Sequence, residues 1–300
     1  MIKMKNSASR KAFLVFNYIF LTAISLICVL PFINLLAISF SSKIAVSTNQ
    51  VTFLPVEFNT AAYEFILNSS AFLKALWISV QRTVLGVLVN LVLIILAAYP
   101  LSKSKEEFRA RGIFSWFFVA TILFSATIIP SYFIVMWTGI KGSILALVLP
   151  GALPVFNMLV VMNYMRNLPK ELEEAAFIDG AGHVQTLVKI ILPVCKPTIA
   201  TVTLFAFVAH WNSWFDGMLY MNKVSDYPLQ SYLQTMVINP EAFFRNAANG
   251  SEGLRNFLDL ANARTTSAAQ LFLATVPILC VYPFLQKYFT TGLVMGSVKG

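Results

Sequence analysis

The sequence LKALWISVQRTVLGVLVNLVLIILAAY, residues 73–99, decides the fold class of this chain. Its charged side chains are Lys74, close to its start, and Arg82. A helix needs about 20 consecutive, mostly apolar residues to cross the hydrocarbon core of a bilayer, and this stretch is longer. The stretch therefore predicts a membrane-spanning helix.

The composition extends this prediction to the whole chain of 300 residues. Hydrophobic residues make up 58% and charged residues 12%, whereas soluble domains have about 45–50% and about 25%. So few charges exclude a soluble enzyme, a disordered chain and a collagen-like repeat, and the cysteines lack the spacing of a disulfide scaffold. Barrel strands alternate with polar residues and would lower the mean hydropathy. We therefore predict an all-α, polytopic membrane protein that forms a single domain over residues 1–300.

Six apolar stretches are long enough to be spans. They are Ala12–Phe40, Leu73–Tyr99, Ile113–Met136, Ile144–Met165, Ile199–Met221 and Ala268–Leu293. The first is too long for the apolar region of a signal peptide, and no small-residue cleavage site follows it, so we expect it to be a retained span. The six predicted spans give the chain an even number of crossings, which puts both termini on one side.

The Lys and Arg residues indicate which side that is, because cytoplasmic loops carry an excess of them. The basic residues gather in the N-terminus, in the connection after the second span, in the segment at about 168–193 and in the C-terminal tail. The sequence thus predicts a multi-pass protein of a bacterial cell membrane with cytoplasmic N and C termini. The long outer loop, about 222–267, lies on the opposite side, and we expect only its first half to be structured.

The inner segment Leu168–Pro193 predicts two short helices joined by a turn. Pro169 suits the start of a helix, and the acidic side chains that follow complement the positive end of its dipole. Gly180 and Gly182 bracket the turn. A compact amphipathic element of this kind suits docking into a groove of another protein, although an ordinary interfacial helix is the alternative.

The same segment resembles the EAA signature of ABC-importer permeases. The positions that match are Glu174, Ala175, Ala176, Gly180, Ile190, Leu192 and Pro193. The sequences WNSW at 211–214 and DYPLQ at 226–230 are also similar to this family, and the resemblance covers essentially the whole chain. The chain resembles the six-span, maltose-type permease subunits of binding-protein-dependent sugar importers, in the branch for oligosaccharides and polysaccharide fragments.

The resemblance implies the type I importer permease fold with a cytoplasmic coupling helix. Glu174 would contact an ATPase subunit, the two alanines would allow close packing, and Gly180 would permit the turn. Ile190, Leu192 and Pro193 would anchor the second short helix. The implied partners are a homologous second permease, two cytoplasmic ATPase subunits that bind ATP and Mg, an extracytoplasmic binding protein and an oligosaccharide. An importer for an amino acid, polyol or phosphate remains an alternative, as does a secondary carrier.

The sequence offers no catalytic, nucleotide or metal site. A P-loop requires the pattern G-x-x-x-x-G-K-[ST], which is missing, so we expect no cofactor on this chain. The histidines, His183 and His210, have no convincing carboxylate partner in sequence. We predict that the chain is a non-catalytic subunit.

A few polar and aromatic side chains within spans are candidates for the substrate pathway. They are Gln81, Arg82, Trp211, Asn212 and Trp214. Polar groups at membrane depth often mark substrate paths, and aromatic rings can stack on sugars. The alternatives are a helix-pairing or snorkelling role for Arg82 and an interfacial aromatic belt for the tryptophans.

Overall fold

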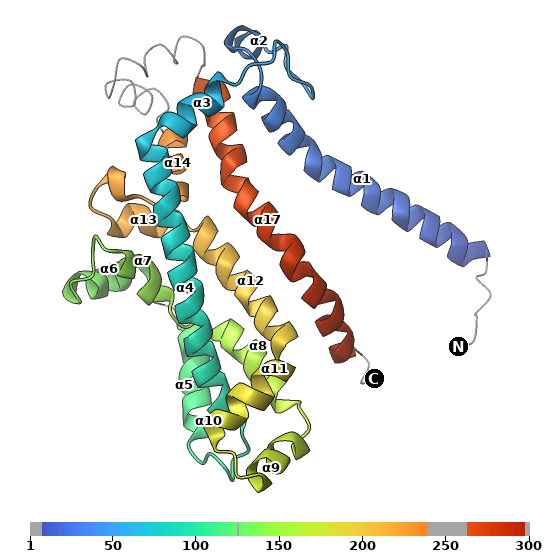
Figure 1. Ribbon diagram of the computed structural model, residues 1–300, viewed down its shortest axis with the longest axis vertical. Helices are drawn as coiled ribbons and strands as arrows, with labels where there is room; N and C mark the ends of the chain where they lie inside the picture. The colour runs from blue at the N-terminus through green and yellow to red at the C-terminus, as the bar shows by residue number, and fades with distance from the viewer. Residues whose placement is uncertain (1–7, 125, 239–262, 298–300) are drawn as a thin grey trace. The chain divides into compact units, whose positions relative to one another are not determined.

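The computed structural model of the protein describes residues 8–124, 126–238 and 263–297, which are helical without a strand (Figure 1). The chain divides into two compact units. The first comprises Met1–Ser70 with Thr235–Thr275, and the second comprises Ala71–Gln234 with Val276–Gly300. The prediction of an all-α fold is confirmed, whereas the single domain over 1–300 stays a prediction.

The first unit begins with a long apolar helix, α1, Ala8–Ser39. Two short helices follow, α2 at Lys43–Ser47 and α3 at Ala61–Asn68. Ser42 caps α2, since its hydroxyl accepts a hydrogen bond from the backbone N–H of Ala45 at 3.2 Å. The ring of Phe40 stacks on Tyr63 with a centroid distance of 4.5 Å, which ties the end of α1 to α3.

The second unit contains the remaining spans and the inner segment. Its membrane-depth helices are α4 (Ser70–Ser102), α5 (Arg111–Leu123), α6 (Ile128–Trp137), α7 (Ile144–Val148), η1 (Leu149–Gly151), α8 (Val155–Arg166), α12 (Lys196–Asn212) and α13 (Phe215–Tyr220). The first half of the outer loop forms η3 (Val224–Asp226) and α14 (Leu229–Ile238). Its second half, residues 239–262, lies outside the described residues. The last long helix, α17 (Ala263–Ser297), contributes to both units.

Spans three, four and five are broken, where continuous apolar stretches had suggested single helices. By length and composition, α1, α4 and α17 could each cross a membrane alone, and three bent helix pairs bring the number to as many as six among the described residues. The pair formed by α7–η1 and α8 bends by 49°. Pro150 and Pro154 flank this bend, and proline removes backbone hydrogen bonds that a continuous helix needs.

The predicted fifth span, Ile199–Met221, ends as a helix at Asn212. Ser213 takes an extended backbone conformation, and α13 starts two residues later. Side chains satisfy the freed polar groups, because the Asp216 carboxylate accepts from the Ser213 hydroxyl at 2.8 Å and from the Gly217 N–H at 2.9 Å. The Ser231 hydroxyl donates to the Trp214 carbonyl at 2.6 Å. These bonds replace the helical ones, which is why the apolar pattern alone did not reveal the break.

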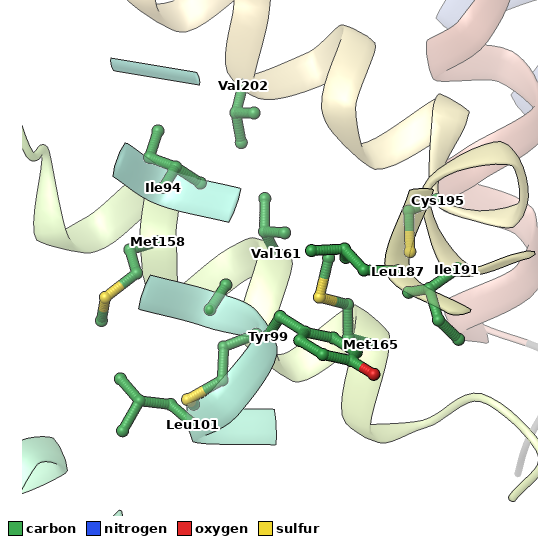
Figure 2. Packing of buried hydrophobic residues seen from close by; sticks show 12 residues of the cluster. Ile94, Tyr99, Leu101, Met158, Val161, Met165, Leu187, Ile191, Cys195 and Val202 are labelled. Carbon is green, nitrogen blue, oxygen red and sulfur yellow. The ribbon is translucent and has the colours of Figure 1, made fainter. Parts of the chain in front are cut away.

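A core of buried apolar side chains connects α4, α8 and the inner segment within the second unit. It is built from Ile94, Ala98, Tyr99, Leu101, Met158, Val161, Met162, Met165, Leu187, Ile191, Cys195 and Val202. Figure 2 shows Leu187, Ile191 and Cys195 gathered on one side of this core, with Ile94 and Met158 on the other. The inner segment therefore shares a hydrophobic core with the spans.

Candidate functional site

The inner segment folds as the predicted pair of short helices around a glycine turn. Its elements are α9 (Glu171–Ile178), α10 (His183–Thr186), the π-helical turn η2 (Leu187–Ile191) and α11 (Leu192–Val194). In Figure 1, α9 and α10 lie together at one end of the second unit, and α13 lies toward the other. The segment continues directly into α12, with a bend of 83° between His183–Val194 and Lys196–Asn212.

Gly180 ends α9 in a left-handed conformation, with φ of +81°. Its N–H donates to the Phe177 carbonyl at 3.0 Å, and the next N–H, of Ala181, donates to the Ala176 carbonyl at 2.9 Å. These two bonds form a Schellman motif, which favours glycine because a Cβ is disfavoured at positive φ. The backbone conformation at the end of α9 therefore explains why glycine is favoured at this position of the signature.

The remaining signature residues divide between the core and the surface. Ala176 is buried, while Glu174 and Ala175 are exposed on α9. Ile190 and Leu192 pack against the core of the second unit, and Pro193 is exposed.

Two apolar side chains project into solvent beside the glycine turn. Ile178 is 86% exposed and Val184 is 76% exposed. Isolated apolar side chains on a surface are ordinary, but these two flank one turn of a compact helical element. They give the turn an apolar tip that a protein partner could cover, and we call it the coupling tip.

An ion pair joins α9 to the end of α4. Lys103 pairs with Glu173, and its ammonium group also lies 4.1 Å from the centre of the Tyr99 ring. Arg111 donates to the Lys103 carbonyl at 3.1 Å. In the same loop, the Ser104 N–H donates to Glu107 at 2.8 Å and lowers the pKa of that carboxyl. The ion pair between Lys103 and Glu173 thus joins the loop after span two to the inner segment.

A cavity of about 370 Å³ lies among α4, α7, η1, α8, α12 and α13 in the second unit, and we call it the polar cavity after the polar side chains in its lining. Its lining includes Arg82, Asn90, Asn157, His210, Ser213, Asp216 and Tyr220. Arg82, which is 2% exposed, forms an ion pair with Asp216 and donates to the Ser213 carbonyl at 3.0 Å. This pair connects span two to the break in span five.

A second set of hydrogen bonds crosses the same cavity. The Asn90 amide donates to the carbonyls of Gly151 and Ala152, at 2.9 and 3.2 Å. Its oxygen lies 2.6 Å from Nε2 of His210. Asn90 therefore links the break in span four to α12.

The structure brings one of the five predicted pathway residues to this cavity. Arg82 lines it and also has the helix-pairing role that was the alternative. Gln81, Asn212 and Trp214 are exposed outside its lining, and Trp211 is buried with its ring stacked parallel to Phe207. The pathway roles of these residues stay predictions.

Sequence reasoning missed the two asparagines of the cavity. Asn90 and Asn157 each interrupt an apolar stretch, and a polar amide at membrane depth was a usable signal. Asp216 follows the break before α13, which the apolar pattern of the sequence did not reveal. The described residues contain no group of three or more His, Cys, Asp or Glu side chains that could hold a metal ion.

The chain is similar to permeases of bacterial transport systems over nearly its whole length. It is 36% identical to the polygalacturonan/rhamnogalacturonan transport system permease protein YtcP of Bacillus subtilis (strain 168), covering 94% of this chain and 96% of that protein. It is 35% identical to Protein LplC of the same organism, covering 99% and 98%. No family model matches the chain.

A solved structure shares both fold and sequence with the chain. It is a chain from the crystal structure of a bacterial ABC transporter involved in the import of the acidic polysaccharide alginate. The TM-score is 0.85 at 30% sequence identity, and the match covers 94% of this chain and 98% of that one.

Proposed function

This chain belongs to the multi-pass permease subunits of ABC sugar importers, and on that premise we propose which sugars it carries and how it is coupled to ATP. The importer carries oligosaccharides or polysaccharide fragments into the cytoplasm. One named relative belongs to a polygalacturonan/rhamnogalacturonan transport system, and the solved structure belongs to a transporter involved in the import of alginate, an acidic polysaccharide. We therefore infer that fragments of acidic polysaccharides are the substrates of this importer.

The inner segment is the coupling element of the proposed mechanism. Its coupling tip, Ile178 and Val184, enters a cleft of a cytoplasmic ATPase subunit, and Glu174 makes polar contact beside it. The Glu174 side chain has no hydrogen bond or ion pair among the described residues, so it is available to a partner. The observation that carries the proposal is the exposed tip on a segment whose other face is packed into the core of the spans.

The remaining parts of the machine are supplied by partners. A homologous second permease pairs with this chain, two ATPase subunits bind ATP and Mg, and an extracytoplasmic binding protein delivers the sugar. This chain itself binds no nucleotide and catalyses no reaction. It resides in the bacterial cell membrane with both termini in the cytoplasm, where the inner segment meets the ATPase.

Two exposed glutamates of α9 provide a matched test of the coupling role. The complete importer is reconstituted in proteoliposomes, and uptake of labelled oligogalacturonides is measured together with ATPase activity. We expect Glu174→Ala to lower uptake and to uncouple ATP hydrolysis from binding-protein stimulation. Glu171→Ala, which alters an exposed carboxylate on the same helix outside the signature, should leave both unchanged. Normal uptake and normal stimulation in the Glu174 variant would refute the assignment.

A further inference from the structure

The connection between α1 and α3 carries a patch of exposed apolar side chains. Phe53 is 52% exposed and Leu54 is 77% exposed, and Ile44 and Phe58 are exposed as well. The stretch 44–56 contains no charged residue. Single apolar side chains on a surface are ordinary, but several of them on one uncharged connection indicate a contact with something apolar.

Hydrogen bonds hold this connection against the end of α1. The Ser42 N–H donates to the Val56 carbonyl at 3.2 Å, and the Asn59 N–H donates to the Phe40 carbonyl at 2.8 Å. The ring of Phe58 stacks on that of Phe40 with a centroid distance of 5.3 Å. The exposed side chains therefore belong to a loop with a defined position relative to α1.

Asn34 shows where the turn at Phe53 and Leu54 lies along α1. The amide of Asn34 donates to the carbonyl of Thr52, the residue before Phe53. Asn34 precedes the end of α1 at Ser39 by five residues, which corresponds to about 7.5 Å along the helix axis. The chain thus folds back along α1 after α2 (Figure 1), and the turn lies close to the level of Asn34 instead of beyond the end of the helix.

This level corresponds to the edge of a bilayer. The basic residues Arg10 and Lys11 come just before the apolar stretch that starts at Ala12. About 20 residues cross the hydrocarbon core, so the core ends near Pro31. Asn34 follows three residues later, about 4.5 Å along the axis, which is within the headgroup region. A tilted α1 would need more residues to cross and would place Asn34 deeper.

The charged residues at the ends of the uncharged stretch support this placement. Lys43 and Glu57 flank it. The Glu57 carboxylate accepts a hydrogen bond from the hydroxyl of Ser42, which follows the end of α1, so this charge lies farther from the bilayer than Asn34 does. Apolar side chains are thus at the level of the headgroups and acyl chains, and the carboxylate is on the aqueous side, as in segments that insert about 5–10 Å into the interface.

We propose that the turn at Phe53 and Leu54 is a membrane anchor, whose apolar side chains insert between lipids at the boundary of headgroups and acyl chains, on the side of the bilayer away from the N-terminus. With the N-terminus in the cytoplasm, this is the outer leaflet. Because Asn34 bonds to the same turn, the anchor also fixes the depth of α1 in the membrane. The inference goes beyond the proposed function and holds whichever solute is carried.

The experiment measures the surroundings of a nitroxide spin label on the turn. Cys28 and Cys280, which are exposed, are replaced by serine, and the buried Cys195 is kept. A label is attached to Leu54→Cys or, independently, to Phe53→Cys, in the complete importer in proteoliposomes without the binding protein. The aqueous reference is Glu64→Cys, since Glu64 is an exposed carboxylate on α3, and a charge is costly inside a bilayer.

Power saturation then compares how often the label collides with oxygen, which concentrates among acyl chains, and with a water-soluble nickel chelate. We expect the ratio of oxygen to nickel accessibility to be severalfold higher at positions 53 and 54 than at position 64. Adding the binding protein should leave this ratio unchanged, because lipid already covers the turn.

Two results would overturn the anchor. Nickel accessibility at positions 53 and 54 equal to that at position 64 would place the turn in water. Low accessibility to both reagents would show that another subunit covers it. Neither result bears on the proposed function, which is tested by sugar uptake and by coupling to ATP hydrolysis.

Discussion

The imidazole ring of His210 lies directly against Gly86 of α4. A Cβ added at Gly86 would come within 2.5 Å of the ring, closer than Cβ atoms approach other non-bonded heavy atoms in proteins. The same edge of the ring bonds to α4, because its Nε2 lies 2.6 Å from the Asn90 oxygen. This contact fixes how closely α12 approaches α4, and it makes Gly86 a sensitive position.

Replacing Gly86 by alanine should destabilise the protein. The added methyl group forces the His210 ring away and disturbs its bond with Asn90, and overpacking of this kind costs about 1–3 kcal/mol. Thermal unfolding of the purified protein in detergent measures the effect. Gly112→Ala is the control, because nothing lies within 4 Å of a Cβ there, and its melting temperature should not fall. Equal stability of both variants would contradict the packing argument.

Removing Arg82 alone should cost more than removing the whole ion pair. Arg82→Met leaves the Asp216 carboxylate without its cation, and breaking a buried pair costs about 3–5 kcal/mol. The Asp216 side chain is 23% exposed, so we expect the lower end, about 3 kcal/mol. The double variant with Asp216→Asn should recover part of the loss in thermal unfolding. A loss equal to the sum of the two single variants would show that the pair is not coupled.

Replacing Gly180 should weaken coupling without creating a clash. Its φ of +81° costs a residue with a Cβ about 1–2 kcal/mol, although no atom lies within 4 Å of that Cβ. Gly180→Ala should therefore loosen the end of α9 and lower uptake per ATP hydrolysed in proteoliposomes. Gly182→Ala is the matched control, since Gly182 has a φ of −80° that alanine accepts, and it is equally uncrowded. The prediction fails if both variants lose the same activity.

The pair between Lys74 and Asp226 should contribute little to stability. Its atoms are 2.8 Å apart, but the side chains are 53% and 37% exposed, and exposed pairs contribute less than about 1 kcal/mol. The hydrogen bond from Lys74 lowers the pKa of Asp226 below its ordinary value of 3.8. The contribution is therefore present at neutral pH and is lost only as the pH falls below about 3.8.

Comparing the melting temperature of Asp226→Asn with that of the unaltered protein across this pH range tests whether the stabilisation by the ion pair is lost as the pH falls. A small difference at pH 7 that vanishes in acid is expected. A difference that grows as the pH falls would refute it.

The apolar stretches of the sequence were sufficient to locate the spans, but not to describe their course. Hydropathy reports how apolar a stretch is, and a break contributes no charge when its polar groups are satisfied internally. The break at Ser213 is stabilised by Asp216, by Ser231 and by Arg82, and Arg82 lies 131 residues away from Ser213 in the sequence. The prolines of span four offered a local signal for its bend, whereas span five had none of comparable strength.

One part of the candidate site could likewise be predicted from the sequence, and another part could not. The signature from Glu174 to Pro193 is local in sequence, so its helices and glycine turn could be predicted. The polar cavity is assembled from five separate helices and one 3-10 turn, and no periodicity connects Asn90 with Asn157 or His210. Arg82 was identified because a charge in an apolar run is conspicuous, but its partner Asp216 required the fold.

The π-helical turn at Leu187–Ile191 determines the rotational phase of the coupling tip. A π turn holds one more residue than an α turn, and one residue corresponds to about 100° of rotation around a helix. Deleting a single residue there would let the turn relax to α-helical geometry and rotate Ile178 and Val184 by about 100° relative to α12. One insertion or deletion in this turn would thus change the direction in which the coupling tip points. Related permeases could fit ATPase subunits with differently placed clefts in this way, without a substitution in the tip itself.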